Sequence, residues 1–133
     1  MKGIKERLEE WLKSIATGNT LPKDIVAVNI GMFETDGGYG VYLCGSDEYD
    51  EEDSDWACEP AYEIPDDYLM LTGDVFESMD WETFQNDIVE ALKEILTSDG
   101  GIINRFIGTR INRFIGKRIV TTGFDDGDLI RIK

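Results

Sequence analysis

A short acidic segment, Asp47 to Trp56, holds the residues of this sequence whose types are best suited to chemistry. Seven carboxylates fall between Asp47 and Asp55, with one aromatic residue inside the run and another directly after it. Carboxylates steer and pair with lysine and arginine, while tyrosine and tryptophan often anchor protein interfaces. Although charge runs are often only solvated loops, we predict a surface for a basic partner here, formed by Tyr49, Asp50, Glu51, Glu52, Asp53, Asp55 and Trp56.

The same segment suggests an alternative function, a module that binds a divalent cation such as calcium. Ca²⁺ takes roughly six to eight oxygen ligands, which the segment could supply in number. Its spacing lacks the glycine and the final glutamate of an EF-hand loop. A second acidic run, Asp125-Asp126-Gly127-Asp128, is typical of a tight turn. We therefore assign no metal ligand and expect no cofactor.

The side chains of most enzyme active sites are missing. The chain has no histidine, which removes the commonest general base, the histidine-containing triads and most zinc sites. Glycine-rich phosphate-binding motifs and the nucleophile elbow are also absent. Cys44 and Cys58 are expected to be small core or near-core residues. Paired carboxylates leave a small hydrolase as a third hypothesis, but we expect a protein that is not an enzyme.

Net charge is the most unusual bulk property. The chain carries 28 acidic and 13 basic residues, a net charge of -15. Residues 24–99 hold 22 acidic side chains and one basic, Lys93, whereas residues 100–118 hold five basic and none acidic. Such acidity repels nucleic acid and anionic membranes and attracts basic proteins. Residues 1–16 lack the apolar core of a signal peptide, so we expect a cytoplasmic protein.

Two segments resemble a known group of proteins. The run GSDEYDEEDSDWAC from Gly45 to Cys58, with GFDDGDL from Gly123 to Leu129, resembles small bacterial immunity-type proteins that accompany polymorphic or contact-dependent toxins. The resemblance implies a non-catalytic cytoplasmic protein that binds and blocks one toxin. Inhibitors of this kind often present acidic surfaces to the basic cleft of a nuclease.

The elements that must position these residues follow from hydrophobic patterning. Apolar residues at helical spacing, from Ile4 to Ile15, predict a first helix that ends at Gly18-Asn19. The same spacing predicts a second helix over residues 81–97, with Asp80 as N-cap. Trp11 and Trp81 lie on the apolar faces of these helices and are expected in the core. Residues 25–33 and 39–44 predict a hairpin, 68–71 a further strand, and 118–132 a second hairpin. Residues 45–67 are expected to form a long connection.

Together these elements predict one α+β domain spanning residues 1–133. We expect an antiparallel sheet of about four to five strands, built from hairpins and packed against the N-terminal helix and the central helix. The oligomeric state stays open.

A tandem repeat separates the central helix from the last hairpin. Residues 103–110 read INRFIGTR and residues 111–118 read INRFIGKR. The apolar spacing favours a helix, weakened by two glycines, and the repeat is interpreted as a natural or engineered duplication. The added copy could extend a helix, loop out, or shift the native segment into the place of the new copy. A basic helical patch for a partner is the alternative to such a structural insertion.

Overall fold

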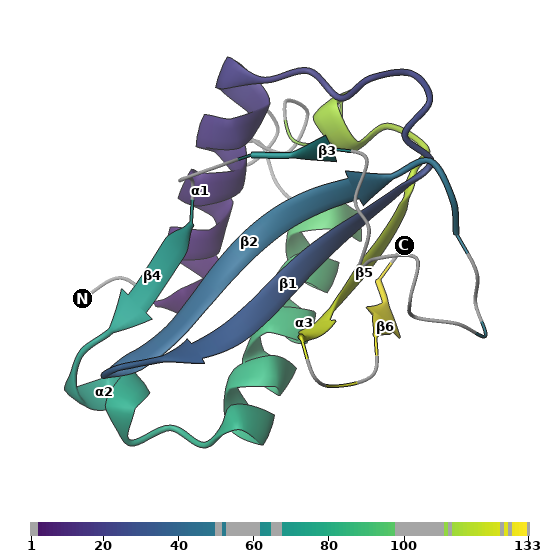
Figure 1. The fold of residues 1–133 in the computed structure, drawn as a ribbon. Coiled ribbons are helices and arrows are strands. Elements are labelled where there is room, and N and C mark those ends of the chain that lie inside the picture. Colours follow the sequence, from purple (N-terminus) through teal and green to yellow (C-terminus); the bar gives the residue numbers. More distant parts are fainter. Residues whose placement is uncertain are drawn as a thin grey trace.

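A computed structural model describes residues 3–49, 52, 62–64, 68–97, 111, 113–125, 127 and 129–132. In this part of the chain, helices and strands are interleaved in an α+β arrangement (Figure 1). The elements in chain order are α1 (Ile4–Gly18), β1 (Ala27–Thr35), β2 (Gly38–Ser46), β3 (Tyr62–Glu63), β4 (Leu69–Thr72), α2 (Asp74–Glu77), α3 (Trp81–Thr97), β5 (Ile119–Phe124) and β6 (Ile130–Arg131).

The predicted first hairpin is confirmed and forms the centre of the sheet. β1 pairs antiparallel with β2, from Ala27 opposite Ser46 to Thr35 opposite Gly38. The reversal at Asp36-Gly37 places Gly37 at a φ of 77°, a left-handed conformation that glycine adopts without steric cost. Both strands extend about two residues beyond the predicted limits, and β1 begins at Ala27 rather than at residue 25.

The sheet is mostly antiparallel, as expected, with one exception. Within the described residues the strand order is β3-β2-β1-β5-β6, and β4 pairs with β2 beside the hairpin turn. β5 runs parallel to β1, with Ala27 opposite Ile119 and Met32 opposite Phe124. Parallel neighbours need a long crossover, and the chain between these two strands includes α3. The strand β3 within residues 45–67 and the short helix α2 are elements that the sequence patterning did not predict.

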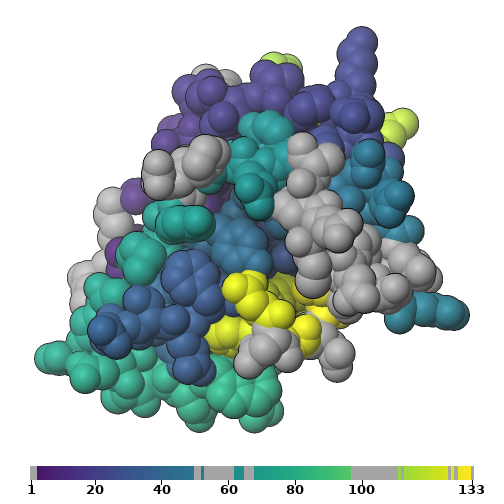
Figure 2. Space-filling model, in the orientation of Figure 1, coloured from purple at the N-terminus to yellow at the C-terminus, as the bar shows by residue number. Residues whose placement is uncertain are grey.

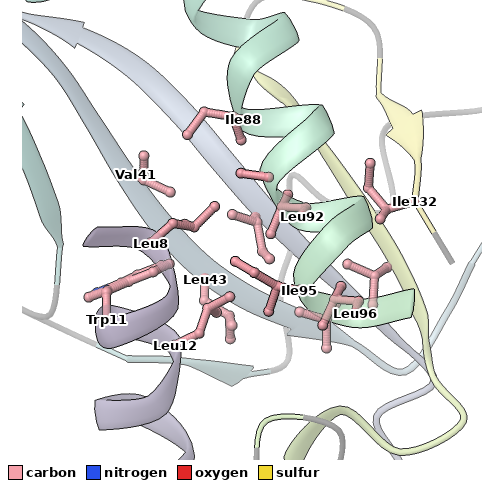
Figure 3. Close-up of a cluster of buried hydrophobic side chains, with 14 of the residues drawn as sticks. Leu8, Trp11, Leu12, Val41, Leu43, Ile88, Leu92, Ile95, Leu96 and Ile132 are labelled. Atoms are coloured by element: carbon pink, nitrogen blue, oxygen red, sulfur yellow. The ribbon is translucent and has the colours of Figure 1, made fainter. Parts of the chain in front are cut away.

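The core lies between the sheet and the two long helices. Side chains from α1, such as Leu8 and Leu12, and from α3, such as Leu92 and Ile95, point toward one another and toward Leu43 of β2 (Figure 3). In β1 and β2, alternate residues face this core because strand side chains alternate between the two faces. None of the helices in the described residues covers the opposite face of the sheet (Figure 1).

The predicted limits of the two long helices are confirmed. α1 ends at Gly18, with Asn19 as its C-cap. The Oδ1 atom of Asp80 accepts a 2.7 Å hydrogen bond from the backbone N–H of Thr83, so Asp80 is the N-cap of α3. None of the helices in the described part of the chain has the length and apolar character needed to cross a lipid bilayer.

The second copy of the tandem repeat is partly described. Ile111 and residues 113–115 are helical, and Ile111, Phe114 and Ile115 are buried in the core. The first copy, residues 103–110, lies outside the described residues. Arg118, the last residue of the repeat, donates hydrogen bonds to backbone carbonyls of Ile25 (2.8 Å) and Pro22 (2.9 Å). It therefore ties the end of the repeat to the segment before β1.

Candidate binding surface

The predicted acidic surface is described only in part. Tyr49 is half-buried, and its ring centroid lies 5.9 Å from the guanidinium carbon of Arg131 on β6. Glu52 is exposed, as are Asp47 and Glu48 just before Tyr49. The start of the acidic segment is therefore placed beside β6. The remaining predicted contact residues lie outside the described residues: Asp50, Glu51, Asp53, Asp55 and Trp56.

The described residues also bear on the cation hypothesis and on the two cysteines. Among them, no group of three or more carboxylate or cysteine side chains is arranged to hold a metal ion. Cys44 is buried, as expected, and burial, together with the nearby Glu63 carboxylate, raises the pKa of its thiol to about 11. A thiol with so high a pKa is a poor nucleophile at neutral pH. Cys58 lies outside the described residues.

An open groove of about 790 Å³ lies at the end of the sheet where β1 and β5 finish. The start of α3 forms one side, and the residues that connect β5 to β6 form another. In Figure 2 the yellow C-terminal residues lie next to the blue residues at the end of β1 and the green residues of α2 and the start of α3. The described lining residues are Met32, Phe33, Glu34, Trp81, Gln85, Phe124, Asp125, Gly127 and Ile130.

Trp81 is the residue of this groove that the sequence patterning placed wrongly. It was expected in the core, but its side chain is 51% exposed. As the first residue of α3 it precedes the buried face, which begins at Phe84. Its ring meets Phe124 edge-on, with 6.1 Å between centroids and an interplanar angle of 88°. The sequence signal for this exposure was that Trp81 directly follows the N-cap Asp80. The first turn of a helix can extend beyond the edge of the sheet on which the helix packs.

Two carboxylates, Glu34 and Asp125, line the groove. Asp125 follows β5, and its backbone N–H donates a 3.1 Å hydrogen bond to the carbonyl of Met32. Its side-chain Oδ1 accepts a hydrogen bond from the hydroxyl of Tyr42. Glu34 is exposed and lies near the end of β1. The pKa of the Tyr39 phenol is raised, mainly by burial and next by the negative charge of Glu34. The groove therefore carries negative charge beside apolar surface.

A cluster of aromatic rings adjoins the groove on the face of the sheet that α1, α2 and α3 leave open. Phe33 lies 6.2 Å from Tyr42 and 5.8 Å from Tyr68, centroid to centroid, and the Tyr68 side chain is 52% exposed. The ring of Tyr42 covers Gly31 so closely that a Cβ there would lie 2.1 Å from the ring. The absence of a side chain at Gly31 therefore leaves room for the ring of Tyr42, whose hydroxyl donates a hydrogen bond to Asp125.

Comparisons with protein-family models, with curated proteins and with solved structures found no match to this chain.

Proposed function

We propose that this chain is a non-catalytic, acidic binding protein that occludes a basic protein partner. In its most specific form, the proposal is a cytoplasmic immunity-type inhibitor that blocks a basic toxin. The observation that carries the proposal is the pairing of a net charge of -15 with exposed aromatic side chains and carboxylates at the end of the sheet where β1 and β5 finish. Trp81 is about half exposed and lines the same groove as Glu34 and Asp125, and Tyr68, also about half exposed, contacts the lining residue Phe33.

The two parts of this surface would have different roles in binding. Net charge of one sign speeds the encounter with an oppositely charged partner and makes the rate fall with ionic strength. Exposed tyrosine and tryptophan supply large, rigid contact areas, which is why they dominate binding energy at protein interfaces. Charge would therefore set the rate of association, and the aromatic side chains would set the lifetime of the complex.

Occlusion is the mechanism that fits these residues. A protein that covers the basic cleft of a toxin needs complementary charge and contact area, and it needs no catalytic group of its own. The contact of Tyr49 with Arg131 supports the view that the acidic segment lies next to β6, the strand that also contributes Ile130 to the groove. The acidic segment and the groove would then contact the same partner.

The proposal is tested by capturing the partner and measuring its association. The chain, immobilised, is exposed to a lysate of the cells that produce it, and captured proteins are identified and purified. A triple variant that neutralises Asp47, Glu48 and Glu52 to the amides should associate more slowly than the wild type. The matched control neutralises three other exposed carboxylates, Glu6, Asp24 and Glu77. Equal slowing by both variants would contradict a binding surface at the acidic segment.

A further inference from the structure

The groove at the end of β1 and β5 combines two kinds of surface that together suit one type of side chain. Its apolar part includes Trp81, Phe33 and Ile130, and its polar part includes Glu34 and Asp125. The inference below rests on the proposed binding of a basic protein, and it identifies the residue type that enters this groove.

The aromatic side of the groove suits a flat cation with an aliphatic stem. Trp81 is held by its edge-on contact with Phe124, yet half of its surface remains exposed to solvent. Tryptophan is the aromatic residue that attracts cations most strongly, and the planar guanidinium of arginine also stacks on aromatic rings. The methylene groups of an arginine can pack on apolar surface such as Ile130 while the charged end extends to a polar one.

The carboxylate side of the groove suits the charged end of the same side chain. Asp125 is fixed by its backbone hydrogen bond to Met32 and by the hydroxyl of Tyr42 on Oδ1. A carboxylate has two oxygens with several acceptor sites, so one donor from Tyr42 does not saturate it. Glu34, exposed on β1, lines the same groove. Guanidinium groups match carboxylates with paired hydrogen bonds that a lysine ammonium cannot form.

The described lining residues of the groove include two carboxylates and neither lysine nor arginine. Arg131, next to the lining residue Ile130 in β6, is placed beside Tyr49 instead. A cation supplied by another molecule would therefore complete the groove. We propose that the groove receives an arginine side chain of the basic partner, stacked near Trp81 and paired with Glu34 and Asp125.

The test uses a blocked peptide, acetyl-Gly-Arg-Gly-amide, titrated into the ¹⁵N-labelled protein. A single side chain binds weakly, so a dissociation constant on the order of 1 mM is expected, equivalent to about -4 kcal/mol. The indole N–H signal of Trp81, assigned with a Trp81→Phe variant, should shift and saturate. The same peptide with citrulline, a neutral isostere of arginine, should give no saturable shift.

Two variants locate the binding. Glu34→Gln should weaken binding of the arginine peptide by roughly 3- to 10-fold, the range for loss of one partly exposed charge pair. Glu6→Gln, which removes the same charge from an exposed position on α1, should leave the affinity unchanged. Thermal unfolding of both variants should match the wild type, which separates an effect on binding from an effect on folding.

The outcomes separate this inference from the broader proposal. Arginine-peptide binding that leaves Trp81 unshifted and is insensitive to Glu34→Gln overturns the assignment of the groove. So does equal binding of the citrulline peptide, or no binding of either peptide at concentrations well above 1 mM. None of these results removes the proposed partner binding by the acidic surface, which is judged separately from the association of the captured protein.

Discussion

Replacing Gly31 with alanine should destabilise the protein because the new methyl group would occupy the space of the Tyr42 ring. The added Cβ would lie 2.1 Å from Cζ of Tyr42 and 2.3 Å from its hydroxyl oxygen. Carbon atoms in contact need roughly 3.5 to 4.0 Å, so the ring must move by about 1.5 Å or more. Gly31 is in β1, which pairs with β2 on one side and β5 on the other, so the ring rather than the backbone will move.

The cost follows from what Tyr42 loses when it moves. Its ring contacts with Phe33 and Tyr68 are worth about 0.5 to 1.5 kcal/mol each. Its hydrogen bond to Asp125 adds about 1 kcal/mol, since the pair is exposed. Alanine recovers about 0.5 to 1 kcal/mol because glycine is unfavourable inside a strand. The net expectation is a loss of about 2 kcal/mol in the free energy of unfolding, measured by urea titration.

A double-mutant cycle tests this reasoning. In a Tyr42→Ala background the three atoms nearest to the added methyl group are gone, so Gly31→Ala should be neutral or slightly stabilising. The two substitutions should therefore be coupled by about 2 kcal/mol. If Gly31→Ala alone leaves stability unchanged, or if its cost is the same in both backgrounds, the ring does not restrict this position and the account of the aromatic cluster fails.

Three further predictions concern the N-cap of α3, the hydrogen bonds of Arg118 and the buried thiol of Cys44. Asp80→Ala should lower the thermal midpoint at neutral pH. Because the N–H of Thr83 depresses the pKa of Asp80, the stabilisation is complete above the unfolded pKa, about 4, and fades as pH falls further, so the two midpoints should converge in acid. Arg118→Met should cost about 2 to 4 kcal/mol in urea titration through lost hydrogen bonds to backbone carbonyls, and Arg118→Lys should recover only part of it. In a Cys58→Ser variant, Cys44 should react with a thiol reagent at pH 8 only after denaturation. A pKa of about 11 leaves roughly a thousandth of the Cys44 side chain as thiolate at that pH, and burial blocks access of the reagent. Rapid labelling of Cys44 in the native protein would refute this.

The local elements of the fold could be predicted because each carries its own signal. Helical spacing and the capping side chain located α3, and the Asp36-Gly37 pair located the first hairpin. The parallel pairing of β1 with β5 could not be predicted in the same way. The pairing depends on the path of the chain between residues 35 and 119, which includes α3. Local sequence patterns do not indicate which earlier strand β5 will pair with.

The groove could not be predicted for a related reason. Its carboxylates, Glu34 and Asp125, are separated by most of the chain and meet only because β1 and β5 are neighbours. Trp81 has the spacing of a core residue, and its exposure depends on where the sheet ends relative to the start of α3. The acidic segment, by contrast, was evident from composition, although only Tyr49 and Glu52 of its predicted contact residues fall within the described part of the chain.

The association rate constant of the captured partner, measured against salt concentration, tests the central proposal most directly. Between about 0.01 M and about 0.1 M salt the Debye length shrinks from about 30 Å to about 10 Å, which screens charges that are not in contact. For a chain with a net charge of -15, steering of a basic partner predicts a steep fall in the association rate, with a much smaller change in the dissociation rate. An association rate that stays constant or rises over this range would contradict the account.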